Sequence, residues 1–351
     1  MTKRLFNAIN SCIMAKQDIK PKLLVILGPT SSGKTSLAVK LAMKFNGEIV
    51  SADSRQVYRG MDIGTGKDLE EFTVIPEGAR NERLIESRYK CISREMLSLR
   101  SAPLQHDIIK IPHHLIDVVS PKKRFNLADY QRLAFKAIDD ILARGKLPIL
   151  VGGSGLYLQA VVDNYLLSGA KPNSGLRKES EKMTSERLFS MLKRQAPNFA
   201  KRLNQSDKNN KRRLIRYLEI VRQGSMEIKT DNKKYQALII GINLPPKELK
   251  ERIKNRLIDR LENQDLIGEV RRLHQQGLSW KKLESFGLEY KFVSLYLQKK
   301  LDYEEMVEKL NRAINQFARR QKSWFRRWEK QGTKINWVKG DNEVQRLLKN
   351  F

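Results

Sequence analysis

The residues whose types and spacing most clearly indicate a chemical role form the stretch GPTSSGKT at positions 28–35. It matches the pattern G-x-x-x-x-G-K-[ST], in which glycines let a loop curl around an anion so that backbone N–H groups face it. The apolar run KLLVIL precedes the stretch, and apolar residues at helical spacing follow it. Lys34 would supply a point charge and Thr35 a hydroxyl for Mg²⁺. The pattern predicts a phosphate-binding loop between a strand and a helix, but not which phosphate ester it holds.

Asp53 and Ser154 each follow a short apolar run, in the stretches IVSADSRQ and ILVGGSG. If both runs are strands of one parallel sheet, their carboxyl ends meet at the edge that carries the phosphate loop. A carboxylate there can take a proton from an attacking group, and a hydroxyl can donate to a leaving-group oxygen. Both residue types also cap helices and turns, so a purely structural role is the alternative for each.

Asp117 ends another apolar run, in HHLIDVV at positions 113–119. There it resembles a strand-end aspartate that holds Mg²⁺ through water, and a turn residue is the alternative. Cys12, Cys91 and the four histidines form no CxxC or HxxxH pattern, so neither a zinc site nor a disulfide framework is expected.

The charge of the chain points to a polyanionic partner. Lys and Arg number 68 against 39 Asp and Glu, a net charge of +29. Seven basic residues fall in the stretch 201–216, and seven face one acidic residue in 311–330. The cluster at 201–216 can follow a nucleic-acid backbone. Added solubility is the alternative explanation of the charge. The apolar stripe in 311–330 is expected to be core rather than a base-stacking platform.

The candidate site residues are positioned by alternating strands and helices. Strand-like runs at 22–27, 48–50, 114–119, 148–151 and 237–242 are separated by helical patterns such as 127–144. This predicts an α/β fold, a parallel sheet with helices on both faces. Between 163 and 233 the strand signal disappears and amphipathic helices at 185–195 and 212–223 indicate a helical insertion.

At 351 residues the chain is expected to divide into parts. We predict a basic N-terminal extension at 1–20, a catalytic core at 21–162 and 234–338, and the helical insertion at 163–233. After Pro245 and Pro246 a long helical region should run to about position 330. The polar segment 67–110 has no predicted role. No apolar run approaches the roughly 20 residues needed to span a bilayer.

Taken in order, GPTSSGKT, SADSRQVYRGMDIGTGK, PHHLID, LVGGSGLYLQAV, RRLIRYLE and ARRQKSWFRRW closely resemble the tRNA dimethylallyltransferases, over about 22–328. That resemblance implies a P-loop NTPase-like fold with a helical insertion. It also implies transfer of a dimethylallyl group from dimethylallyl diphosphate to the exocyclic amine of the adenosine on the 3′ side of the anticodon in tRNA. Mg²⁺ would be required. We expect a cytoplasmic, monomeric enzyme without a membrane segment.

The resemblance also assigns roles to single residues. Asp53 matches the general base, and Ser154 stands where the family usually has threonine. Thr35 and Asp117 would bind the metal. Contacts to the target nucleotide fall to Asp53, Ser54, Arg55 and Gln56, and the grip on the anticodon stem falls to Arg177, Arg212, Arg213 and Arg216. The diphosphate would be held by Gly28, Thr30, Ser31, Ser32, Gly33, Lys34, Thr35 and Arg256.

Three departures from the family pattern stand out. Ser154 lacks the methyl group that helps fix a threonine rotamer. The stretch FGLEYK at 286–291 differs from the usual glycine-tyrosine-basic pattern. The segment between Gly66 and Pro112 is longer than is common. It could form a lid, a partner surface or an inert surface loop, and the last is the default interpretation.

Three other functions use some of the same features. A small-molecule P-loop kinase would bind ATP in the loop but has no need of two basic clusters. A non-catalytic RNA-binding protein would tolerate the loss of Asp53. A related enzyme that prenylates free AMP would not need the charge of the insertion.

Overall fold

The computed structural model describes residues 20–67, 73–74, 109–167, 169–224, 232–339, 341–349 and 351. The predicted extension at 1–20 therefore lies almost wholly outside the described residues, and so does most of the segment 67–110. The described parts of that segment include a short antiparallel pair, β3 (Thr73–Val74) with β4 (Ile109–Lys110).

A six-stranded sheet in the order β5-β2-β6-β1-β7-β8 organises the first of two compact units. All of its strand pairs are parallel. The apolar runs of the sequence become the central strands because both faces of each strand are covered. The strands are β1 (Lys22–Leu27), β2 (Gly47–Ser51), β5 (His113–His114), β6 (Leu147–Gly152), β7 (Gln236–Ile242) and β8 (Asn336–Val338).

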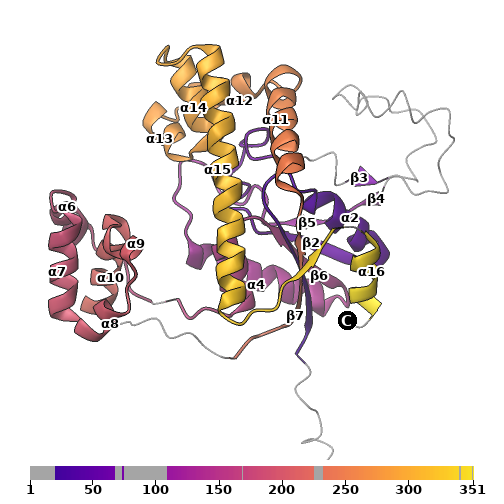
Figure 1. Cartoon of the computed structure of the whole chain (residues 1–351), viewed down its shortest axis with the longest axis horizontal. Coiled ribbons are helices and arrows are strands. Elements are labelled where there is room, and N and C mark those ends of the chain that lie inside the picture. The colour runs from indigo at the N-terminus through magenta and orange to yellow at the C-terminus, as the bar shows by residue number, and fades with distance from the viewer. Residues whose placement is uncertain are drawn as a thin grey trace, which may run out of the picture. The chain divides into compact units, whose positions relative to one another are not determined.

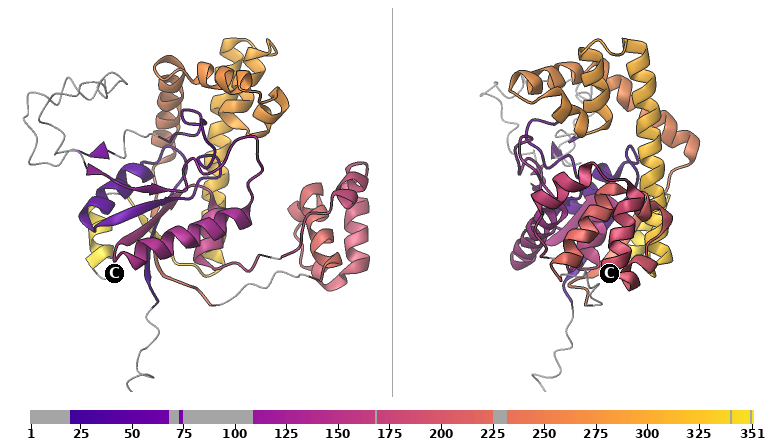
Figure 2. Two further views of the ribbon diagram at one scale, coloured as in Figure 1. Left: turned by 180° about the vertical axis from the view of Figure 1, so that it is seen from behind. Right: turned by 90° about the vertical axis from the view of Figure 1, so that its left-hand side faces the viewer.

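Alternation along β1 divides the core into two layers. Leu23, Val25 and Leu27 join one apolar cluster, and Leu24 and Ile26 join the other. The first layer packs against α4 (Leu127–Ala143), α5 (Gly155–Val162) and the C-terminal part of α15 (Tyr303–Lys330). The second packs against α2 (Lys34–Lys44) and α16 (Asp341–Lys349). Figures 1 and 2 show these helices beside the sheet, and the predicted α/β class is confirmed.

The long helical region forms a second group within the same unit. It consists of α11 (Pro246–Glu262), α12 (Leu266–Gln275), α13 (Trp280–Ser285), α14 (Leu288–Leu297) and α15. Leu310 and Ile314 of α15 pack on α11, whereas Phe325 and Trp328 pack on the sheet. Leu310, Ile314 and Trp328 of the apolar stripe are thus core, as predicted, whereas Phe317 and Trp324 are only partly buried. The helix α15 connects the helical group to the sheet (Figure 1).

The second unit is Asp163–Asn232, one residue short of the predicted insertion. It contains α6 (Ser174–Glu181), α7 (Ser185–Gln195), α8 (Pro197–Lys201), α9 (Gln205–Lys208) and α10 (Lys211–Arg222). Thr184 and Asn210 cap α7 and α10 through their side chains. Leu188, Leu192, Leu214 and Leu218 are fully buried between these two helices and form the centre of the unit's own core.

One predicted strand was wrong in extent. The run HHLIDVV forms a strand only at His113–His114, because Leu115 and Asp117 have positive φ angles of 66° and 58° that turn the chain. Asp117 therefore does not end a strand. β8 and α16 were not predicted either, since three residues of strand and nine of helix give a weak pattern. Among the described helices, none is long and apolar enough to cross a membrane.

We expect Gly152→Ala to destabilise the core by about 1–3 kcal/mol, the usual cost of overpacking. A Cβ at position 152 would overlap the carbonyl oxygen of Ala52, which also accepts a hydrogen bond from the Ser154 N–H at 3.2 Å. Urea unfolding followed by far-UV circular dichroism measures the effect, because this signal reports on the helices of both units and so also on the control.

The matched control for this substitution is Gly169→Ala. A Cβ there meets no atom within 4 Å. Equal unfolding midpoints for the two variants would contradict the packing argument.

Candidate active site

The phosphate loop curls tightly between β1 and α2. Ser31 and Gly33 adopt positive φ angles of 60° and 84°, so the glycine at position 33 is required by the turn. A Cβ on Gly28 would lie 2.6 Å from the Ser32 hydroxyl, which shows how closely the loop folds on itself. That hydroxyl is buried and has no hydrogen-bond partner among the described residues. The loop therefore keeps a donor that a bound anion can satisfy.

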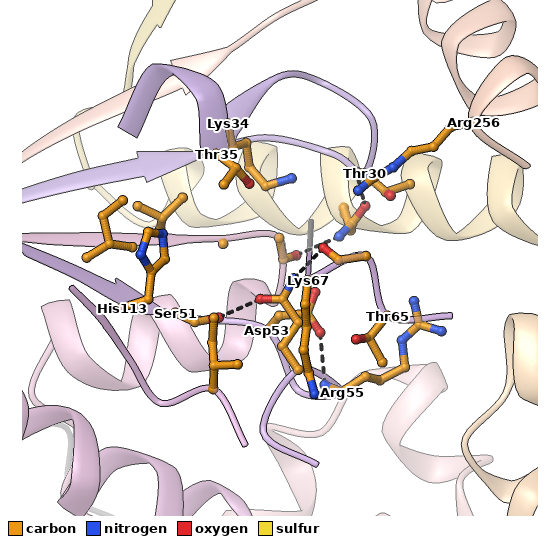
Figure 3. A pocket seen from close by; sticks show the side chains of 18 of the residues that line it. Thr30, Lys34, Thr35, Ser51, Asp53, Arg55, Thr65, Lys67, His113 and Arg256 are labelled. Carbon is orange, nitrogen blue, oxygen red and sulfur yellow. Dashed lines mark hydrogen bonds between the residues drawn. The ribbon is translucent and has the colours of Figure 1, made fainter. Parts of the chain in front are cut away.

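A pocket opens beside this loop at the carboxyl ends of the strands (Figure 3). Lys34 and Thr35 lie on one wall, and Asp53 lies on the other. The other lining residues come from the phosphate loop, from β2, β5 and β6 and the segments after them, and from helices α11 and α15; they are Thr30, Ile49, Ser51, Arg55, Gln56, Thr65, Gly66, Lys67, His113, Ile116, Val151, Gly152, Gly153, Arg256, Arg260, Phe317 and Gln321. Of the predicted diphosphate ligands, Thr30, Lys34, Thr35 and Arg256 line the pocket, and Gly28, Ser31, Ser32 and Gly33 shape the loop.

The segment after β2 presents Asp53 to the pocket. The Arg55 N–H donates to Asp53 Oδ1 at 2.8 Å, a local bond that orients the carboxylate. The Ser54 N–H donates to the hydroxyl oxygen of Ser154 at 3.0 Å. This places Ser154 beside the aspartate segment, although Ser154 does not line the pocket. Its hydroxyl accepts in this bond, so its proton remains for another acceptor.

Gln321 of α15 joins the phosphate loop to the loop after β6. Its Oε1 accepts from the Thr30 N–H at 2.9 Å, and its Nε2 donates to the Gly153 carbonyl at 3.0 Å. The side chain is 6% exposed, so neither bond is easily replaced by water. One buried amide therefore fixes the separation of two pocket loops.

Asp117 and Lys67 form a neighbouring ion pair. The buried Lys67 ammonium bonds to Asp117, to Asp62 Oδ1 at 2.6 Å and to the Tyr58 carbonyl at 2.8 Å. Asp117 is not among the residues that line the pocket. Its carboxylate holds a lysine instead, so its predicted role as a metal ligand gains no support from its position.

His113 adds no positive charge to the pocket at neutral pH. Burial lowers its pKa to about 4, and its Nδ1 lies 2.8 Å from the Ile111 carbonyl. The cationic character of the pocket therefore comes from lysine and arginine.

In the second unit, two of the predicted tRNA-binding arginines hold a buried carboxylate. Arg177 bonds to both oxygens of Glu219, at 2.7 and 3.0 Å, and Arg216 bonds to Oε2 at 3.1 Å. Burial alone would raise the pKa of Glu219, but Arg177, Arg216 and the Asn173 N–H hold it below its usual value. Arg213 pairs with Asp207 at 2.6 Å, and Arg212 is exposed. Arg177 and Arg216 are thus structural parts of the unit, whatever they contact besides.

Comparison with known proteins decides the family. A model described as IPP transferase matches residues 94–328, and one described as isopentenyl transferase matches residues 21–75. The tRNA dimethylallyltransferase 1 of Syntrophus aciditrophicus is 43% identical over 324 residues, covering 91% of this chain and 94% of that protein. The chain belongs to the tRNA dimethylallyltransferase family. It is accordingly a prenyltransferase, and the resemblance predicted from its motifs is confirmed.

Solved structures of tRNA dimethylallyltransferases agree with this fold. The tRNA isopentenylpyrophosphate transferase of Bacillus halodurans superposes with a TM-score of 0.58 at 31% identity, covering 94% of each chain. A eukaryotic dimethylallyltransferase acting on tRNA gives a TM-score of 0.65 at 26% identity, covering 87% of this chain and 69% of that one. The predicted P-loop NTPase-like architecture is confirmed.

A magnesium ion carried by a diphosphate, as the resemblance implies, would need few protein ligands from this pocket. Mg²⁺ keeps several waters and usually takes only one or two protein ligands when phosphate oxygens supply the rest. The Thr35 hydroxyl lies on the pocket wall beside Lys34, where it meets that need (Figure 3). No cluster of three or more metal-ligating side chains is found in the described part of the chain, so an all-protein metal cage is not what the site offers.

Several pocket residues escaped prediction from the sequence. Arg260 lies four positions after Arg256 and so shares its face of α11, a spacing that could have revealed it. Gln321 lies within the ARRQKSW motif, where the basic and aromatic neighbours carried the interpretation. Lys67 lies in the motif SADSRQVYRGMDIGTGK, and Glu289, which adjoins the pocket, lies in FGLEYK. Their partners Asp117 and Arg55, 50 and 234 positions away, could not be read from the sequence.

We expect Gln321→Leu to weaken both the fold and the affinity of the pocket for a diphosphate ligand. The Thr30 N–H and the Gly153 carbonyl would lose buried partners, at about 1–3 kcal/mol for each group left unsatisfied. Urea unfolding and calorimetric titration with dimethylallyl diphosphate measure the two effects. Gln316→Leu, at an exposed position of the same helix, is the control. Wild-type affinity in Gln321→Leu would show that the amide does not set the loop geometry.

Proposed function

We propose that this enzyme transfers the dimethylallyl group of dimethylallyl diphosphate to N6 of the adenosine that follows the anticodon in tRNA. The supporting observation is that Lys34 and Thr35 of the phosphate loop share one pocket with the carboxylate of Asp53. The pocket thus combines a leaving-group site with a proton acceptor. The named relatives act in this reaction class, and the chain covers nearly all of the curated relative's length.

In the proposed reaction the C1–O bond of the allyl diphosphate breaks as the adenine N6 forms a bond to C1. Diphosphate leaves with the bond electrons, and N6 loses a proton to Asp53. Lys34, Arg256 and the loop N–H groups stabilise the charge that develops on the diphosphate. Mg²⁺, held by Thr35 and phosphate oxygens, would neutralise part of that charge when bound.

The apolar lining fits the other half of the donor. Ile49, Ile116, Val151 and Phe317 line the same pocket as the cations. They would surround the dimethylallyl group and keep water from an electron-poor allylic carbon. Positioning and water exclusion are thus the main contributions of the protein, since an allylic diphosphate ionises readily.

The tRNA would be held outside the pocket by the basic second unit. We propose that Arg212 and Arg213 follow the phosphates of the anticodon stem, whereas Arg177 and Arg216 keep the unit folded through Glu219. Drawing the adenine out of its loop costs a few kcal/mol, which backbone contacts can offset. The proposed site of action is the cytoplasm, and the proposed form is a monomer.

Asp53→Asn should lower kcat by about a hundredfold or more, because the amide accepts no proton at neutral pH. Purified enzyme, Mg²⁺, unmodified tRNA and dimethylallyl diphosphate are incubated, and nucleoside mass spectrometry quantifies the prenylated adenosine. The affinity for tRNA, measured by filter binding, should stay within about threefold of wild type. Ser285→Ala, in α13, is the control. No product from the wild-type protein would reject the proposed function, and full activity of Asp53→Asn would reject the proposed base.

The double change Arg212→Ala, Arg213→Ala should weaken tRNA binding and flatten its salt dependence by about one to two units of slope. Each arginine that neutralises a phosphate releases a counterion, and both side chains lie on the exposed start of α10. Lys136→Ala, at an exposed position of α4, removes charge from the first unit and serves as the control. A slope identical to wild type would exclude these two arginines from the RNA interface.

A further inference from the structure

Glu289 is a buried carboxylate next to the pocket, in the first turn of α14. It falls in the FGLEYK stretch that departs from the usual family pattern. Its Oε2 lies 2.6 Å from Arg55 Nη1, and its Oε1 lies 3.2 Å from Arg260 Nη1. Both arginines line the pocket, so one carboxylate binds two of the positively charged side chains that surround it.

The two arginines come from different parts of the chain and have different neighbours. Arg55 follows Asp53 and also lies over the Phe317 ring, 6.0 Å from its centroid. Arg260 lies one helical turn after Arg256 on α11, and the guanidinium groups of both pack against the backbone of Gly66. Glu289 therefore connects the side of the pocket that holds the proposed base with the side that holds the proposed diphosphate ligand.

Electrostatics explains why such a carboxylate is needed. Like charges four residues apart on a helix repel each other, and Arg256 and Arg260 are such a pair. Bringing Arg55 to the same pocket adds a third guanidinium. A carboxylate buried between Arg55 and Arg260 offsets the repulsion and fixes both side chains by charge-assisted hydrogen bonds. Burial alone would raise the pKa of Glu289, but Arg55 and Arg260 hold it below its usual value, so the group is ionised at neutral pH.

We propose that Glu289 is a positioning residue of the transfer reaction. It holds Arg55 beside the proposed base, Asp53, and Arg260 beside the proposed diphosphate site. It acts through the arginines and does not itself line the pocket. The inference rests on the proposed function, since it assigns the two arginines to a diphosphate-binding pocket.

Glu289→Gln tests the proposal, because the amide keeps the shape but loses the charge and one acceptor. We expect kcat/KM for dimethylallyl diphosphate to fall about ten- to a hundredfold, the effect of losing a charged hydrogen bond. KM for tRNA should change less than kcat/KM for dimethylallyl diphosphate, because the second unit, which holds the anticodon stem in the proposed function, is untouched. Glu289→Asp restores the charge and should recover part of the lost kcat/KM.

The control is Glu48→Gln, which alters another buried carboxylate. Glu48 is 2% exposed and binds Arg144 and Lys146, neither of which lines the pocket. It should lower the thermal midpoint while leaving kcat/KM near wild type. Equal kinetic losses in Glu48→Gln and Glu289→Gln would show a general effect of stability and overturn the proposal.

A double-mutant cycle separates positioning from simple folding. If Glu289 acts through Arg55, the loss caused by Glu289→Gln should shrink at least about threefold when Arg55→Gln is already present. If Glu289→Gln lowers kcat/KM by the same factor with and without Arg55→Gln, the proposal is overturned while the proposed function remains intact. A wild-type enzyme that makes no prenylated adenosine would instead overturn the proposed function, and this inference with it.

Discussion

A pocket for a diphosphate must gather positive side chains at close range before the anion arrives. Among the described residues that line it, Lys34, Arg55, Lys67, Arg256 and Arg260 face a single carboxylate, Asp53. These positive side chains repel one another. The repulsion destabilises the folded protein unless negatively charged groups lie nearby. The surrounding structure supplies those counter-charges: Glu289 for two arginines, and Asp62 and Asp117 for the lysine.

The sheet and the group of helices α11 to α15 both contribute residues to the pocket and to its charge compensation. The carboxyl edge of the sheet carries the phosphate loop and the segment with Asp53 and Arg55. Helices α11, α14 and α15 carry Arg256, Arg260, Glu289 and Gln321. Because α15 packs on the sheet through Phe325 and Trp328 and on α11 through Ile314, it holds the two layers at one separation. Gln321 then fixes two loops at the point where the layers meet.

The second unit manages charge in the same way. Glu219 is fully buried and binds both Arg177 and Arg216, so these two basic residues also stabilise the folded unit. The side chains of these arginines remain 38% and 35% exposed, which leaves their outer edges open to solvent. A high net charge in such a unit is compatible with stability because each buried acid satisfies more than one base. The number of basic residues thus overstates the positive charge that is free to attract RNA, whereas the net charge of +29 already subtracts their acidic partners.

Local patterns in the sequence determined the phosphate loop, the strands β1, β2, β6 and β7, the insertion and the order of the motifs. These features depend on neighbouring residues, through turn geometry and the period of apolar side chains. Only the tertiary structure decided that Asp117 holds Lys67 and that Glu289 joins Arg55 to Arg260. Arg55 and Glu289 are 234 residues apart, so their contact exists only after α14 packs against the segment that follows β2. Short-range periodicity carries no information on such pairs, because burial and charge compensation are properties of the folded chain.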